Sequence, residues 1–144
     1  MRCVIQRVRS ASVTVDGETV GKIGRGLLVL CGFTEGDDEE KIKWVAGRIA
    51  KLRIFTDKND KLNHSCIDVR GSVLCVSNFT LYGDCLHGNR PDFGRAAKGA
   101  VSRPMYETFV AALRTYVPTE TGRFGEHMEL SLDIDGPITT VLEK

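Results

Sequence analysis

Apolar and polar residues alternate along the first third of the chain, a pattern that is typical of β-strands. Two alternating runs, residues 4–15 and 20–23, flank Asp16-Gly17. Asp-Gly between alternating segments favours a type I′ hairpin, because both central residues of that turn need positive φ. A second turn at residues 24–26 leads into the apolar run 27–33, which indicates a strand buried on both faces.

Two stretches show the apolar spacing of amphipathic helices. An acidic segment at residues 37–40 suits a helix N-terminus, and the apolar stripe that follows it comprises Ile42, Val45, Ile49 and Leu52. Trp44 lies beside this stripe, where we expect it to pack in the core, with an interface as the alternative. A second stripe covers residues 105–116, and Ser102 and Pro104 are expected to start its helix.

The second half of the chain contains two further strand signals. Residues 72–81 form an apolar run that polar residues interrupt from Ser77 onward, and residues 83–104 predict a long irregular loop. A last alternating strand over residues 128–142 is broken at Asp135-Gly136-Pro137. A proline between two β runs requires an edge, a bulge or a cis bond.

This order of elements, β-rich, helix, β, helix, β, predicts the fold class. We expect a mixed α+β domain, with a β-rich sheet or partial barrel and two covering helices. The 144 residues fit a single domain over residues 1–144.

Composition narrows the class of protein. The longest apolar run, Leu27–Cys31, is far shorter than the roughly twenty residues of a membrane-spanning helix, so no membrane is expected. The five cysteines are odd in number and the first residues show no signal-peptide pattern, which favours reduced thiols and a cytoplasmic protein. Net charge is +1, so any contact with nucleic acid requires a local basic face; residues 87–103 carry four cations and one acid.

The motifs of common catalytic and metal sites are absent from the sequence. His64-x-Cys66 and Cys85-x-His87 contain zinc-ligating residue types, but a one-residue gap is unlike structural zinc spacing, and no metal or cofactor is expected. Cys85 with His87 is retained as a minor hypothesis for a cysteine hydrolase. Each of the three histidines is expected to lie at the surface.

Seven segments, spread along nearly the whole chain, resemble the D-aminoacyl-tRNA deacylase family. The signature motifs Ser-Gln-Phe-Thr-Leu and Asn-x-Gly-Pro-Val-Thr appear here as residues 77–81 and 134–139. The other segments that look like the family are residues 1–8, 23–29 with 51–55, 88–93 and 121–125.

The resemblance implies a homodimer that hydrolyses the ester between a D-amino acid, or glycine, and the 3′ end of tRNA, without a metal or cofactor. It also implies a cis Gly136-Pro137 bond that projects into the partner's site, where its carbonyls reject an L side chain. Arg7 would hold this segment in place. Phe124 would stack on the terminal adenine.

The resemblance also gives roles to the first motif, which comprises Ser77, Asn78, Phe79 and Thr80. Backbone N–H groups around Phe79 and Thr80 would form an oxyanion hole for the ester carbonyl. Thr80 is the candidate side-chain nucleophile, but no base is adjacent in sequence. The resemblance implies the terminal 2′-hydroxyl of the tRNA as the activator, as in the family's usual mechanism.

Two positions depart from the family pattern. Asn78 stands where the family has Gln, and Ile134 stands where it has Asn. These changes leave two alternatives open: a relaxed deacylase that acts on L-alanyl-tRNA, and a tRNA-binding module without catalysis.

Overall fold

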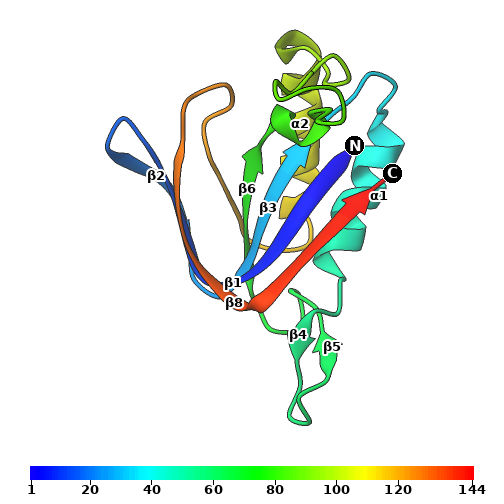
Figure 1. The fold of residues 1–144 in the computed structure, drawn as a ribbon. Helices are drawn as coiled ribbons and strands as arrows, with labels where there is room; N and C mark the ends of the chain where they lie inside the picture. Colours follow the sequence, from blue (N-terminus) through cyan, green and yellow to red (C-terminus); the bar gives the residue numbers. More distant parts are fainter.

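A long N-terminal strand, β1 (Arg2–Val15), organises the sheet in the computed structural model, which describes residues 1–144. Strand β1 pairs antiparallel with β2 (Glu18–Ile23) and β3 (Gly26–Gly32) along one edge, and with β8 (Glu129–Glu143) along the other. Strand β6 (Ser72–Ser77) joins β3 in parallel, and β7 (Thr119–Thr121) joins β6 (Figure 1). The predicted hairpin is present, with positive φ at both Asp16 and Gly17.

The six-stranded sheet bends until its two ends approach each other. A Cβ on Gly21 in β2 would lie only 2.5 Å from Thr121 O in β7, so the close approach of these strands requires glycine. The bent sheet encloses a small apolar core of seven buried residues, which are Val8, Ala11, Val13, Ile23, Leu28, Leu74 and Val76. The partial barrel that the sequence predicts is therefore confirmed.

Two helices, α1 (Glu39–Ala50) and α2 (Gly99–Arg114), cover the other face of the sheet (Figure 1). Between helices and sheet lies the main core of 22 buried residues, to which both predicted apolar stripes contribute. Helix α1 begins as expected, because Asp38 Oδ1 accepts a hydrogen bond of 2.7 Å from Lys41 N–H. Neither helix is long and apolar enough to cross a membrane.

The remaining elements are short. Strands β4 (Phe55–Thr56) and β5 (Leu62–His64) form a small separate hairpin. A 3₁₀ helix, η1 (Phe79–Tyr82), follows β6 directly. The long loop after η1 contains one isolated β-bridge, between Asp84 and Asp92.

Three predictions about individual elements are wrong. The strand expected over residues 72–81 ends at Ser77, because the Asn78 side chain caps η1 and turns the backbone out of the sheet. Helix α2 begins at Gly99 rather than at residues 102–104, so Pro104 lies inside the helix and cannot donate to the carbonyl four residues earlier. Trp44 is not in the core; its side chain is 40% exposed on the outer face of α1.

Strand β8 contains a bulge at the predicted break. Gln6 pairs with Thr139 and Val8 pairs with Ile134, so four residues of β8, 135–138, lie opposite Arg7 alone. The Gly136–Pro137 peptide bond within this bulge is cis, and both residues are exposed. The proline is therefore accommodated where the ladder is interrupted, as its position in the sequence predicts.

Candidate active site

One cavity of about 560 Å³ opens where β3 and β6 end. Its wall combines the last residues of these two strands with η1, the first turn of α2 and the loop at residues 124–128. Because β3 and β6 are parallel neighbours, their carboxyl ends lie together at one edge of the sheet. Four of the predicted site residues, Ser77, Asn78, Phe79 and Thr80, line this cavity, and so does Phe124.

The backbone at Asn78 fixes the position of the first motif. Asn78 N–H donates to Cys31 O at 2.8 Å, which extends the β3–β6 ladder by one residue before the chain turns into η1. Gly32 makes this turn possible, because a Cβ at that position would lie 2.9 Å from Asn78 O. The motif is thus held against the end of β3 by backbone contacts.

The first N–H groups of η1 lack partners within the helix, as at any helix N-terminus. Asn78 Oδ1 accepts the Thr80 N–H at 3.2 Å and also the Thr80 hydroxyl at 2.5 Å. Phe79 N–H is the first of these groups and receives no such side-chain cap. Of the two backbone donors that the resemblance implies, that of Thr80 is therefore occupied by Asn78.

Phe124, which also lines the cavity, is held by two side chains of α2. Its ring lies 5.6 Å from that of Tyr106, whose hydroxyl donates to Cys75 O at 2.9 Å inside the core. The Arg103 guanidinium lies 4.8 Å from the centre of the Phe124 ring, and Arg103 Nη2 donates to Phe124 O at 3.5 Å. These contacts fix the ring at the cavity wall, a position suited to stacking on a planar base.

The other three predicted site residues, Arg7, Gly136 and Pro137, lie together but outside the cavity. Arg7 is buried, with 7% of its surface exposed, and its Nη1 donates to Ile54 O at 2.8 Å. Arg7 Nε lies 2.8 Å from Asp135 Oδ2; the pair is ionic, because the N–H direction falls outside hydrogen-bond geometry. Arg7 therefore anchors the base of the β8 bulge.

Comparison with known proteins agrees with the motif pattern. A family model described as D-Tyr-tRNA(Tyr) deacylase matches residues 4–143. The chain belongs to this family. A D-aminoacyl-tRNA deacylase of Thermosipho africanus is 51% identical over 144 residues, covering 99% of this chain and 97% of the relative. Another from Pelobacter propionicus is 53% identical over 145 residues and covers all of both chains. The resemblance seen in the sequence is thus confirmed.

Two solved structures share the fold over nearly the whole length. One, a c-Myc DNA Unwinding Element Binding Protein, is 40% identical with a TM-score of 0.94, covering 100% of this chain and 99% of its own. The other, a probable eukaryotic D-amino acid tRNA deacylase, is 18% identical with a TM-score of 0.84 and covers 98% and 97%. The second likeness supports the fold alone.

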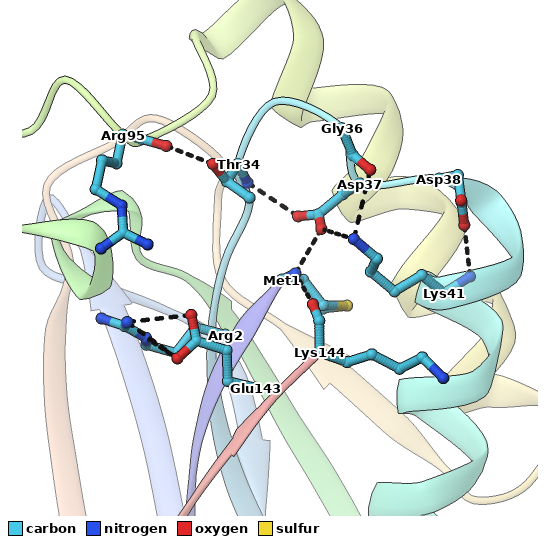
Figure 2. A network of polar contacts seen from close by, with 10 residues as sticks. All are labelled: Met1, Arg2, Thr34, Gly36, Asp37, Asp38, Lys41, Arg95, Glu143 and Lys144. Carbon is cyan, nitrogen blue, oxygen red and sulfur yellow. Dashed lines mark hydrogen bonds and ion pairs between the residues drawn. The ribbon is translucent and has the colours of Figure 1, made fainter.

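In this member of the deacylase family, a network of polar contacts joins Met1 to the segment just before α1 and to the end of β8 (Figure 2). The Met1 ammonium lies 2.5 Å from Asp37 Oδ1, and both groups are fully buried. Burial acts to raise the pKa of Asp37, but hydrogen bonds from this ammonium, from Thr34 N–H and from Lys41 outweigh it and hold that pKa below its usual value.

Two segments of the cavity wall, the loop before α2 and η1, are held by contacts from this region of the molecule. Thr34 Oγ1 donates to Arg95 O at 2.7 Å, which ties down the long loop before α2. Arg2 Nη1 donates to Leu81 O at 2.6 Å and so holds η1. The Asp37 carboxylate therefore supports the long loop through Thr34, whereas Arg2, next to Met1 in the sequence, supports η1.

Several cavity residues could not be identified from the sequence. Gly32, Ser102, His127, Met128 and Leu130 line the wall, although they come from four separate elements or loops. One signal was available, because a glycine at the end of an otherwise apolar strand indicates close approach of another backbone. His127 is exposed, as predicted, but it also lies on the cavity wall.

The cysteine and histidine pairs singled out in the sequence lie elsewhere. No group of three or more His, Cys, Asp or Glu side chains is arranged to hold a metal ion. Cys66 is buried and its pKa is raised to about 11 by desolvation, which makes its thiolate scarce at neutral pH. Cys85 and His87 are exposed in the long loop, and neither lines the cavity.

Proposed function

We propose that this protein hydrolyses the ester bond of D-aminoacyl-tRNA and releases the D-amino acid and free tRNA. The observation that carries the proposal is that two features line one cavity: Phe79, whose N–H at the start of η1 has no side-chain cap, and the aromatic residue Phe124. The first suits an ester carbonyl that becomes negative in the transition state. The second suits the unpaired terminal adenine.

In this proposal the chain contributes positioning and backbone dipoles. The ester carbonyl accepts from Phe79 N–H, and the adenine rests on the Phe124 ring that Arg103 and Tyr106 support. The terminal 2′-hydroxyl of the tRNA activates the attacking water. Cleavage then breaks the bond between the acyl carbon and the 3′-oxygen, and the 3′-oxygen takes up a proton.

Selection between D and L substrates is assigned to the Gly136-Pro137 bulge of a second copy of the chain. In its own subunit the bulge lies outside the cavity, so a neighbouring subunit is the way for it to meet a substrate. Strand β8 also leaves large apolar side chains uncovered, namely Leu132, Ile134 and Val141. An uncovered apolar strand face supports a homodimer through this region.

The deciding experiment is deacylation by the purified, untagged protein. D-Tyr-tRNA and Gly-tRNA are expected to lose their aminoacyl group, whereas L-Tyr-tRNA persists. Loss of both enantiomers at equal rates, together with cleavage of L-alanyl-tRNA, would favour the relaxed deacylase. Binding of tRNA without any turnover would favour the non-catalytic module.

The shared site has its own test. Gly136→Ala places a Cβ 2.9 Å from Ile138 N at a φ of +122°, so the bulge should distort while the cavity of that subunit stays intact. Phe79→Pro removes the proposed carbonyl donor and leaves the bulge intact. Mixing the two inactive variants should restore activity in heterodimers. Failure of the mixture, with heterodimers demonstrated, contradicts the shared site.

A further inference from the structure

A second groove lies on the outer face of α1, away from the candidate cavity. It has a volume of about 590 Å³ and is lined by four cations, Lys43, Arg48, Lys51 and Arg53, and by no carboxylate. The whole chain carries 20 cations and 19 acids, so a groove with four of one sign and none of the other is a concentrated positive field. We refer to it as the α1 groove.

Two of these cations are free to meet a ligand. Lys43 is paired with Glu39, and Arg53 is hydrogen-bonded to Asn63. Arg48 and Lys51 have no carboxylate partner. They lie over aromatic rings instead, which leaves their charges uncompensated.

Those rings are the second feature of the α1 groove. Trp44 and Tyr116 are each 40% exposed, and they line the groove together with the cations. The Arg48 guanidinium lies 4.7 Å from the centre of the Trp44 ring, and Lys51 Nζ lies 5.4 Å from that of Tyr116. Aromatic rings interleaved with unpaired cations are typical of surfaces that bind nucleic acid.

Gly47 makes the groove possible. It lies inside α1, where a glycine costs roughly 1 kcal/mol of helix stability relative to alanine. A Cβ there would lie 3.0 Å from Tyr116 Oη, so an alanine would push the Tyr116 ring away from the helix. The glycine thus allows Tyr116 to lie across α1 and form a wall of the groove.

We propose that the α1 groove binds the phosphodiester backbone of tRNA, with Arg48 and Lys51 as the phosphate ligands. The proposal rests on the proposed function for its choice of RNA. It goes beyond that function because the cavity contacts only the 3′ end.

The spacing of the two sites fits one tRNA molecule. Gly99 and Ser102, at the start of α2, line the cavity, whereas Tyr116, just after the end of α2, lines the groove. The 16 residues of α2 span about 24 Å. A stacked nucleic-acid strand covers that distance in about seven nucleotides at 3.4 Å each. A tRNA with its 3′ end in the cavity would therefore place acceptor-stem phosphates within reach of the groove.

The test measures binding of uncharged tRNA, so it does not depend on catalysis. Arg48→Gln with Lys51→Gln removes two exposed charges, and Lys58→Gln with Lys61→Gln makes the same change in net charge in the exposed β4–β5 turn. The first pair is expected to weaken binding about tenfold and to reduce the slope of log affinity against log salt by about two. The control pair should match the wild type.

Trp44, the single tryptophan of the chain, gives a direct signal from the groove. Titration with tRNA should change its fluorescence in the wild type and in the control pair. Equal weakening by both pairs, an unchanged salt slope, or loss of binding that follows dissociation of a homodimer would each overturn the proposal.

A short substrate separates this inference from the proposed function. Deacylation of a D-aminoacylated fragment of three or four nucleotides should be unaffected by the R48Q/K51Q change, whereas deacylation of intact D-aminoacyl-tRNA should slow. If the wild type cleaves neither substrate, the proposed function fails, and the binding measurement still decides the groove. Equal slowing on both substrates would contradict a groove that contacts only the stem.

Discussion

Asn78 holds Thr80 through two hydrogen bonds, because its Oδ1 accepts both the backbone N–H, at 3.2 Å, and the hydroxyl, at 2.5 Å. The N–H is one of the two donors that the family resemblance implies for the ester carbonyl. An asparagine side chain is short enough to accept from the backbone two residues ahead. Glutamine, with one more methylene, does not favour this turn.

The first prediction follows from that competition. Asn78→Gln should release Thr80 N–H and raise kcat about 2- to 10-fold, the size of one net hydrogen bond. KM should change little, because the gained bond strengthens as charge develops in the transition state. Steady-state deacylation of D-Tyr-tRNA measures both constants. A lower kcat would mean that the cap at Asn78 supports the active geometry rather than competing with it.

The second prediction concerns the donor that Asn78 leaves open. Phe79→Pro removes the Phe79 N–H, and the helix start tolerates proline because Asn78, with φ −144° and ψ 93°, lies outside the α region that a following proline disfavours. The expected loss in kcat is about 10²- to 10³-fold. Phe79→Ala is the matched control, since it removes the ring but keeps the N–H. If the two variants lose the same activity, the ring rather than the N–H matters.

The main features of the fold could be predicted because they depend on local patterns. Alternation, the Asp16-Gly17 turn and the two apolar stripes each depend on residues close in sequence. The exposure of Trp44 could not be predicted, because α1 has a complete apolar stripe without it and the ring finds partners in Arg48 and the distant Lys144. The burial of Arg7 also depends on residues that are distant in sequence, because its partners Ile54 and Asp135 come from other segments.

The candidate site likewise has a part that could be predicted from the sequence and a part that could not. The motif at residues 77–80 could be found because polar residues interrupt an apolar run. The rest of the cavity wall arises from tertiary pairing: parallel β3 and β6 end side by side, and the loop at residues 124–128 closes over them. The strand that starts at residue 72 was predicted to extend to residue 81 but ends at Ser77. A side-chain cap at Asn78 overrides the β propensity of the residues that follow.

The third prediction concerns stability and pH. Asp37→Asn leaves the Met1 ammonium buried without its counter-charge, which should cost about 3–5 kcal/mol in the free energy of unfolding. Thermal or urea unfolding at pH 7 measures this loss. Asp38→Asn, at the exposed N-cap next in sequence, is the control and should cost about 1 kcal/mol or less.

The pH dependence of the Asp37 contribution has a definite sign. The pKa of Asp37 is lower in the folded protein than the unfolded value of about 3.9, so its contribution is complete above that value. It is lost as pH falls through the folded pKa. The difference in stability between wild type and D37N should therefore be constant from about pH 5 to pH 7 and narrow below about pH 4. A difference that instead disappears at alkaline pH only would contradict the role of the carboxylate.

The fourth prediction separates the possible activators of the attacking water. The Thr80 hydroxyl donates to an amide oxygen, Asn78 Oδ1, which is not a base, so Thr80 is poorly placed to act as a nucleophile. Thr80→Ala should keep measurable activity, because losing a positioning hydroxyl costs far less than losing a covalent nucleophile. His127, like Glu126, lies on the cavity wall and offers an alternative base, and His127→Ala should also remain active. A D-aminoacyl-tRNA that ends in 2′-deoxyadenosine should be cleaved very slowly by the wild type and by both variants, since the activating hydroxyl is then missing from the substrate. Normal cleavage of the 2′-deoxy substrate, combined with an inactive T80A or H127A variant, would assign the activation to that side chain instead.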